Sequence, residues 1–359
     1  MDFGEYDDMT TIPTTQQAAL VENPGPTARI VHRDDVPVAT PGPNEILVKL
    51  TCTGLCHSEI RAVLGWGPYN PIVAHEGIGT VVQTGPQVSP SMMHQRVGIK
   101  WLYSACGKCS VCARGFPNNC PHQWNTGRHV PGTLQQYVVA DARYVSAIPD
   151  GLSDEIAAPL LCAGLSMAGA LSKLDGEVQA GDWVVISGSG GGLGHIGVQI
   201  AARIRGFRVI AIDHGEAKRA LSLQSGAEVF LDYKEDDLVR RVLEITGEGA
   251  HAILVVPGTE AAFQVAPSLV RNLASIVCVG LPPNQFNLPI SATACAARGL
   301  VIKGACVGTD AQMDELLRQA LAGKLTPLVE VLEFSETARV IEGLKTDTIT
   351  GRVVVKIPQ

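Results

Sequence analysis

The second half of the chain alternates short apolar strands with helical segments, and glycines cluster after the first strand. Segment 182–188 (DWVVISG) is apolar and β-branched, and 195–206 has the apolar spacing of a helix. The alternation continues through strand candidates at 208–213, 228–232, 251–256, 274–280 and 299–304, with helical patterns at 215–226, 236–247 and 259–270. Strands that alternate with helices form parallel βαβ units, and strands this apolar are buried on both faces. We therefore predict a doubly wound α/β domain with six parallel strands.

The glycines lie where such a domain binds a dinucleotide. We place the turn at Gly188-x-x-Gly191-Gly192-Leu193-Gly194, a set whose spacing differs from strict G-x-G-x-x-G. Glycines let the backbone approach a pyrophosphate at the N-terminus of the next helix, whereas the alternative is a simple surface turn.

An acidic residue follows the glycines at the spacing of a dinucleotide site. The next strand ends in Asp213, about 20 residues after the loop, where a carboxylate binds the adenosine ribose. Asp213 would repel a 2′-phosphate, which favours NAD over NADP. Lys218 could also reach the ribose.

The first part of the chain has a different rhythm. Short alternating segments stand between proline- and glycine-rich turns at 16–23, 45–54, 77–85, 96–101 and 134–142. This pattern predicts a β-rich domain with long loops. A helix at 313–323 and a strand at 351–357 follow the α/β region, so we expect the chain to return to the first domain. Residues 1–16 are predicted to form a loose tail.

Charge and hydropathy narrow the function. The net charge is −7, which argues against general nucleic-acid binding because that function needs a basic surface. The most apolar run, 157–171, contains Pro159 and two glycines, so we predict no membrane span. The acidic N-terminal segment lacks the features of a secretory or mitochondrial leader, and we expect a cytoplasmic protein. In that compartment clustered cysteines bind metal more often than they form disulfides.

Four cysteines are spaced for one metal ion. They follow the pattern Cys106-x2-Cys109-x2-Cys112-x7-Cys120 within a polar, glycine-containing stretch. Four thiolates can close the shell of a tetrahedral zinc ion, which makes the site structural. An iron–sulfur cluster and reduced core cysteines are the alternatives.

Three distant residues raise a second possibility. Cys56, His75 and Cys162 offer two thiolates and one imidazole, a ligand set that leaves one zinc position open. Taken singly, each has an ordinary structural explanation, and their spacing is not diagnostic. The remaining cysteines lie in or beside apolar strands and are expected to fill the core: Cys52, Cys278, Cys295 and Cys306.

Several motifs in this order resemble a zinc-dependent medium-chain alcohol dehydrogenase of the tetrameric branch common in fungi and bacteria. They are GLCHSE, AHEGIGTVV, the lobe ending in CPH, GTLQQYVVAD, LLCAG, ISGSGGGLG and TGRVVVKI. The resemblance implies an α/β protein with a GroES-like β-rich catalytic domain and a Rossmann NAD-binding domain. The implied bounds are 17–166 plus 308–359 for the former, with a structural-zinc lobe at 104–122, and 167–307 for the latter.

The resemblance also implies roles for individual residues. Cys56, His75 and Cys162 would hold a catalytic zinc, with Glu76 close enough to exchange as a ligand. Cysteines 106, 109, 112 and 120 would hold a structural zinc. His57 and Arg352 would contact the cofactor phosphates. Ser58 would begin a proton relay, and Trp101 would line the substrate pocket.

Three positions depart from the family pattern. Arg61 stands where many relatives have the histidine that ends the proton relay, and arginine does not deprotonate in proteins. Glu59 replaces the common aspartate that orients the metal-bound histidine. The stretch 63–77 is arranged differently from that of simple ethanol-oxidising members, with Trp66 and Tyr69 as candidate pocket walls. We take these changes to indicate a larger or biosynthetic substrate.

The implied function is reversible hydride transfer between a small-molecule alcohol, aldehyde or ketone and NAD(H), with zinc as a Lewis acid. The resemblance implies a homotetramer, or else a dimer, with no nucleic-acid or membrane partner. One alternative is a medium-chain reductase of an activated C=C bond, which the complete Cys56, His75 and Cys162 set argues against. Another is a zinc-ribbon binding protein, which the acidic charge and the glycine loop argue against.

Overall fold

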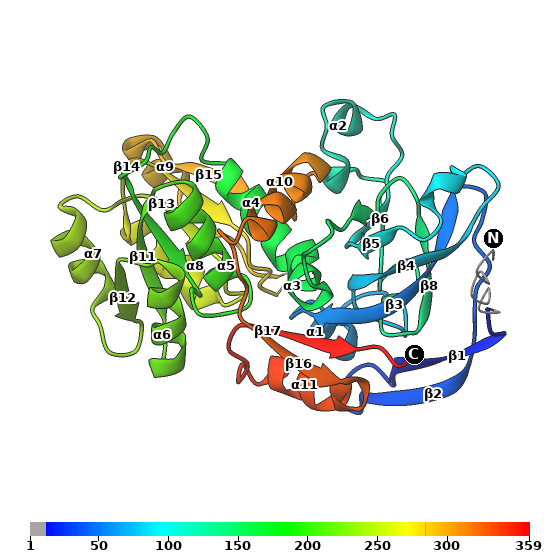
Figure 1. The fold of residues 1–359 in the computed structure, drawn as a ribbon. Coiled ribbons are helices and arrows are strands. Elements are labelled where there is room, and N and C mark those ends of the chain that lie inside the picture. The colour runs from blue at the N-terminus through cyan, green and yellow to red at the C-terminus, as the bar shows by residue number, and fades with distance from the viewer. Residues whose placement is uncertain (1–11, 284) are drawn as a thin grey trace.

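The computed structural model describes residues 12–283 and 285–359, and Figure 1 shows two halves, each built on its own sheet. Most of the predicted tail, residues 1–11, lies outside the described residues. The predicted tail was wrong for residues 15 and 16, because β1 already begins at Thr15 and pairs with β2.

The predicted Rossmann sheet is present. Its six strands run parallel in the order β12-β11-β10-β13-β14-β15, with the glycine-rich turn after β10. Their bounds are β10 (Trp183–Ser187), β11 (Arg208–Asp213), β12 (Val229–Asp232), β13 (Ala250–Val255), β14 (Val270–Cys278) and β15 (Val301–Gly304). Alternate residues of β10 pack into different hydrophobic clusters, Val184 on one face and Val185 on the other. Both faces of the sheet are therefore buried, which explains the uniformly apolar strands.

Helices cover both faces of this sheet (Figure 1). They are α5 (Gly194–Gln199), which continues through a π-helical turn at Ile200–Ile204, α6 (Glu216–Ser225), α7 (Leu238–Thr246), α8 (Glu260–Val265) and α9 (Ala292–Arg298).

The other half is built on a seven-stranded sheet, β16-β17-β3-β4-β5-β9, with β8 paired to β3. The predicted return of the chain is confirmed, because β17 pairs antiparallel with β3. The strand bounds are β3 (Glu45–Leu55), β4 (Glu76–Thr84), β5 (Arg96–Ile99), β8 (Tyr137–Asp141), β9 (Ser146–Ala147), β16 (Val329–Glu333) and β17 (Arg352–Lys356).

Smaller elements surround this sheet. Two short two-stranded sheets are β1 (Thr15–Glu22) with β2 (Arg29–Pro37), and β6 (Leu102–Ser104) with β7 (Trp124–Asn125). The helices are α1 (Glu59–Val63), α2 (Ser110–Ala113), α10 (Asp310–Leu321) and α11 (Thr337–Lys345). The sequence patterns did not indicate β2, β16, α9 or α11.

A buried helical stretch, Asp154–Ser172, joins the two halves. It consists of α3 (Asp154–Pro159), a π-helical turn at Leu160–Gly164 and α4 (Leu165–Ser172). By length and hydropathy it could cross a membrane, contrary to our expectation that Pro159 and the glycines would break the run, but 78% of it is buried inside the protein. It is a core helix, in which tertiary packing outweighs the poor helix propensity of proline and glycine.

Candidate active site

Three chain segments bring Cys56, His75 and Cys162 together in the buried interior. Cys56 lies between β3 and α1, His75 directly precedes β4, and Cys162 lies in the π-helical turn of the core helix. The Sγ atoms of the two cysteines are 3.8 Å apart, and Nε2 of His75 lies 3.2 Å from Sγ of Cys162. Together with Glu76, their ligand atoms all lie within 4.8 Å of one another. The predicted juxtaposition is thus present.

Glu59 fixes two members of this cluster. One of its carboxylate oxygens lies 3.1 Å from Nδ1 of His75, and the other accepts the backbone N–H of Cys56 at 2.6 Å. The extra methylene of glutamate therefore still allows the expected contact with the histidine. Nδ1 of His75 is engaged, so Nε2 faces the cysteines.

The pKa values of His75 and Cys56 are both shifted by their neighbours in the cluster. Burial lowers the pKa of His75, but the neighbouring Glu59 and Cys56 outweigh burial and raise it to about 10. A hydrogen bond from Cys162, supported by His75 and Arg352, holds the pKa of the Cys56 thiol well below its ordinary value. The surroundings therefore stabilise a negative charge on Cys56 and a positive charge on His75.

Glu76 is engaged by Arg352. The Nη2 atom of this arginine, at the start of β17, contacts both carboxylate oxygens of Glu76, and both side chains are almost fully buried. Burial raises the pKa of Glu76 to about 7, and the guanidinium limits that rise. Glu76 thus lies within ligand distance of the cluster while its oxygens are held by an arginine.

The second cysteine cluster is equally compact. The Sγ atoms are 4.0 Å apart for Cys106 and Cys112, 3.9 Å for Cys109 and Cys120, and 3.5 Å for Cys106 and Cys120. Backbone N–H groups of Lys108 and Cys109 lower the pKa of Cys106 to about 6.

Both clusters have the dimensions of a tetrahedral zinc site. A zinc–sulfur bond of about 2.3 Å gives a sulfur–sulfur edge of about 3.8 Å in a tetrahedron. In the four-cysteine cluster three of the sulfur–sulfur distances lie between 3.5 and 4.0 Å and all lie within 4.8 Å, and the Cys56–Cys162 distance is 3.8 Å. The donors present therefore fit zinc at both places.

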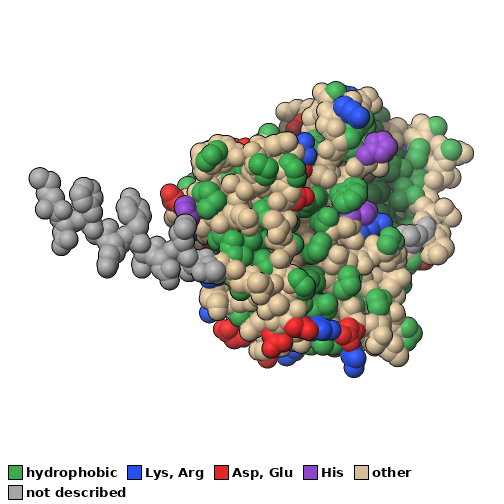
Figure 2. Space-filling model, turned by 90° about the vertical axis from the view of Figure 1, so that its right-hand side faces the viewer, with side chains coloured by type: hydrophobic (Ala, Val, Ile, Leu, Met, Phe, Trp, Pro, Cys, Tyr) green, Lys and Arg blue, Asp and Glu red, His purple; other side chains and the backbone are tan. Residues whose placement is uncertain are grey.

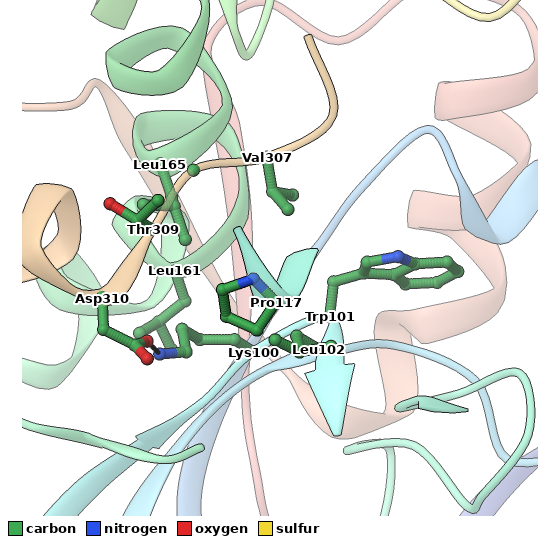
Figure 3. A pocket seen from close by; sticks show the side chains of 10 residues that line it. Lys100, Trp101, Leu102, Pro117, Leu161, Leu165, Val307, Thr309 and Asp310 are labelled. Carbon is green, nitrogen blue, oxygen red and sulfur yellow. Dashed lines mark hydrogen bonds and ion pairs between the residues drawn. The ribbon is translucent and has the colours of Figure 1, made fainter. Parts of the chain in front are cut away.

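Trp101 borders the buried cluster. Its ring meets that of His75 edge to face at a centroid distance of 5.0 Å. Beside Trp101 a crevice runs between Pro117 of the cysteine lobe, the core helix and the segment 307–310 (Figure 3). Lys100 crosses this crevice and forms an ion pair with Asp310 at the start of α10. Trp101 thus contacts His75 with its ring and lines this crevice as well.

The other predicted substrate and relay residues lie on or near α1. Trp66 is 46% exposed and packs under the Arg61 guanidinium, 5.6 Å from the ring centroid. The hydroxyl of Ser58 donates to Glu59 at 3.3 Å, and His57 is exposed. Tyr69 is half-buried against the core of the β-rich half, with Arg128 over its ring. Roles for these side chains in substrate or cofactor binding stay predictions.

The glycine loop lies between β10 and α5, as predicted. A side chain at Gly194 would meet the Gly188 carbonyl oxygen at 2.0 Å, so this position admits only glycine. Asp213, at the end of β11, accepts the backbone N–H of Gly190 at 2.9 Å, and Lys218 lies 3.6 Å from its carboxylate. Lys218 also pairs with Asp347 at 3.0 Å. Asp213 is thus tied to the glycine loop by a hydrogen bond.

Sequence reasoning overlooked one glycine of this segment, Gly197. The strict G-x-G-x-x-G spacing does occur, as Gly192-Leu193-Gly194-His195-Ile196-Gly197, and its last glycine lies three residues beyond Gly194. Gly197 allows α5 to pack closely on Met167 of the core helix, because a Cβ there would lie 2.3 Å from the Met167 methyl carbon. A search for the strict spacing would have found Gly197.

The expected core position of Cys306 was wrong, because this residue is exposed between β15 and α10, beside the edge of the sheet.

Comparisons with known proteins agree with this architecture. Residues 42–150 match the alcohol dehydrogenase GroES-like domain, and residues 192–322 match the zinc-binding dehydrogenase family. Alcohol dehydrogenase 2 of Emericella nidulans is 37% identical, over 96% of this chain and 98% of its own. An alcohol dehydrogenase of Geobacillus stearothermophilus is 40% identical, over 87% and 92%.

Solved structures show the same fold. Acetophenone reductase from Geotrichum candidum, solved in complex with NAD, has a TM-score of 0.84 and 29% identity, covering 96% of this chain and 98% of its own. The alcohol dehydrogenase of Aeropyrum pernix has a TM-score of 0.87 and 26% identity, covering 95% and 100%. On the matched domains and these full-length relatives, the chain belongs to the zinc-type medium-chain alcohol dehydrogenase family.

Proposed function

We propose that the chain is an NAD(H)-dependent alcohol dehydrogenase or carbonyl reductase that interconverts alcohols with aldehydes or ketones. The observation that carries the proposal is the buried set of Cys56, His75 and Cys162, linked through Glu76 and Arg352 to the glycine loop. This arrangement places a metal-type ligand set and a dinucleotide-type loop on either side of one arginine. Relatives with the same organisation are named alcohol dehydrogenase and acetophenone reductase.

Two zinc sites per chain are part of this proposal. Cys56, His75 and Cys162 would hold a catalytic zinc, and the four lobe cysteines a structural zinc. When bound, the catalytic zinc supplies Lewis acidity toward the substrate oxygen. The chain's own residues prepare the site: Glu59 holds His75 and the Cys56 backbone in place, and Arg352 holds Glu76. Burial of all these groups excludes water, which strengthens each electrostatic contact.

NAD is favoured over NADP. Asp213 is buried and accepts the backbone N–H groups of Gly190, in the loop, and of His214, so a 2′-phosphate there would meet a fixed negative charge. Lys218 is already engaged by Asp213 and Asp347, which reduces its availability for a phosphate.

The proton path differs from that of relatives with a relay histidine. Ser58 can donate and accept a proton, but Arg61 cannot serve as the terminal base. We propose that the proton passes from Ser58 to solvent without a terminal side-chain base, and that the enzyme acts on a larger or biosynthetic substrate. The exposed aromatic ring of Trp66 and the placement of Trp101 beside His75 support a pocket shaped for a bulky group.

We further propose a homo-oligomer, a tetramer or else a dimer, in the cytoplasm. Strand β15 is at the edge of the described sheet, and its Val301 and Ile302 are 41% and 39% exposed. An open apolar edge is a place where a second copy can extend the sheet.

On the face shown in Figure 2 acidic and basic side chains are mixed along the lower edge, which with the net charge of −7 supports a small-molecule substrate over nucleic acid. We also propose domain bounds near 166/167 and 307/308, which the division of the strands between two sheets supports, with the β-rich domain beginning by Thr15 rather than at residue 17.

The test is NADH formation by the purified protein with small primary, secondary, allylic and benzylic alcohols. Activity should be lost on chelation and in Cys162→Ser, and kept in Cys278→Ser, a cysteine outside both clusters. Reduction of an activated C=C bond that survives chelation would favour the alternative reductase. Absence of NADH binding would reject the proposal.

A further inference from the structure

Two buried polar side chains of α5 fasten the glycine loop to the other half of the molecule. His195, in the first turn, is fully buried, and Gln199 is 3% exposed. Both contact the segment 326–328, which joins α10 to β16 of the seven-stranded sheet. The proposed chemistry uses neither side chain.

The hydrogen bonds of His195 decide its tautomer. The backbone N–H of Leu328 donates to Nε2 at 3.0 Å, so this nitrogen carries no proton. The proton is therefore on Nδ1, which donates to the carbonyl oxygen of Gly191 at 2.8 Å. Burial lowers the pKa of His195 to about 4, which keeps the ring neutral and both bonds intact near neutral pH. One ring thus connects the glycine loop to residue 328.

Gln199 repeats the connection one helical turn later. Its Nε2 donates to the carbonyl oxygen of Thr326 at 3.0 Å, and its Oε1 accepts the backbone N–H of Thr326 at 2.9 Å. Residues four apart share one face of a helix, so both side chains reach the same segment. Three hydrogen bonds therefore join α5 to residues 326–328.

These contacts continue toward the buried cluster of Cys56, His75, Glu76 and Cys162. The carbonyl oxygen of Leu328 accepts the backbone N–H of Arg352 at 2.9 Å. The Arg352 side chain lies against the loop, since a Cβ on Gly192 would be 2.7 Å from its Cδ, and its guanidinium pairs with Glu76. Through His195 the backbone of the loop and the backbone of Arg352 share one anchor, Leu328.

We propose that His195 and Gln199 are positioning residues that hold the coenzyme-binding glycine loop in register with Arg352, so that both meet the coenzyme pyrophosphate. The inference rests on the proposed function, because NAD(H) is the ligand to be positioned. Loss of the anchor would let the loop and Arg352 shift independently, which weakens coenzyme binding more than it slows the chemical step.

The experiment compares NADH affinity by fluorescence titration, together with KM for NAD and kcat. His195→Ala removes both ring hydrogen bonds, His195→Gln keeps an acceptor for the Leu328 N–H, and Gln199→Met removes both amide bonds. His251→Gln is the control, because His251 is bonded to Asp182 and the Trp183 N–H at the far end of β10.

We expect about tenfold weaker NADH binding in His195→Ala, of the order expected for lost buried hydrogen bonds. We also expect a matching rise in KM for NAD, and kcat within about twofold. His195→Gln should recover most of the affinity, and Gln199→Met should be weakened about threefold.

The outcomes are separable. Lower melting temperatures with unchanged NADH affinity and KM would show a packing role only and overturn the inference. If His195→Ala does not fold, Gln199→Met decides, since unchanged affinity in that variant also overturns it. Failure of the unaltered protein to bind NADH would reject the proposed function instead.

Discussion

The buried ion pair between Glu76 and Arg352 allows a quantitative test. Their side chains are 0% and 3% exposed, and Glu76 has both oxygens on one guanidinium. Removing one partner leaves the other charge buried without compensation, which costs about 3–5 kcal/mol, whereas removing both is nearly neutral. Glu76→Gln and Arg352→Met should each lower the melting temperature by about 6–10 °C, at about 2 °C per kcal/mol.

The double variant distinguishes this reasoning from simple loss of packing. Because no buried charge stays unpaired in Glu76→Gln with Arg352→Met, this double variant should be more stable than the sum of the single effects by about 6–10 kcal/mol, or about 12–20 °C. The assay is thermal unfolding by circular dichroism at one protein concentration and at pH 8. Effects that add to within about 0.5 kcal/mol would refute the coupling.

Three further results are expected. The buried His195, which Arg352 faces, has a pKa of about 4 against 6.5 for an ordinary histidine, so the folded state binds fewer protons in that window. Its stability contribution is lost as pH falls from 6.5 to 4, by about 3 kcal/mol, and His195→Gln should flatten the profile of melting temperature against pH. Cys106→Ser should lower bound zinc from two ions to one per chain by mass spectrometry of the metal, whereas Cys295→Ser should retain both. Ile302→Glu should reduce the oligomer size in sedimentation, whereas the exposed α7 variant Leu243→Glu should leave it unchanged. An unchanged size in Ile302→Glu would show that β15 is not an interface.

The sequence by itself determined the α/β alternation, the glycine loop, Asp213 and the four-cysteine spacing, whereas the family resemblance was needed to group Cys56, His75 and Cys162. These signals are local or belong to a set of motifs, and each follows from a physical requirement: buried strands are apolar, a tight turn needs glycine, and zinc needs thiolates or imidazole. The four lobe cysteines lie within 15 residues, so their clustering required little knowledge of the fold.

Only the tertiary structure decided which distant groups meet. Residue spacing carries no information on contacts across 276 positions, the separation of Glu76 from Arg352, because that contact exists only when β17 returns to pair with β3. The His195 anchor to Leu328 spans 133 positions in the same way. The helical stretch through Pro159 was misjudged for a related reason. Local propensity argued against a helix there, but burial of the stretch between the two halves of the molecule outweighed it.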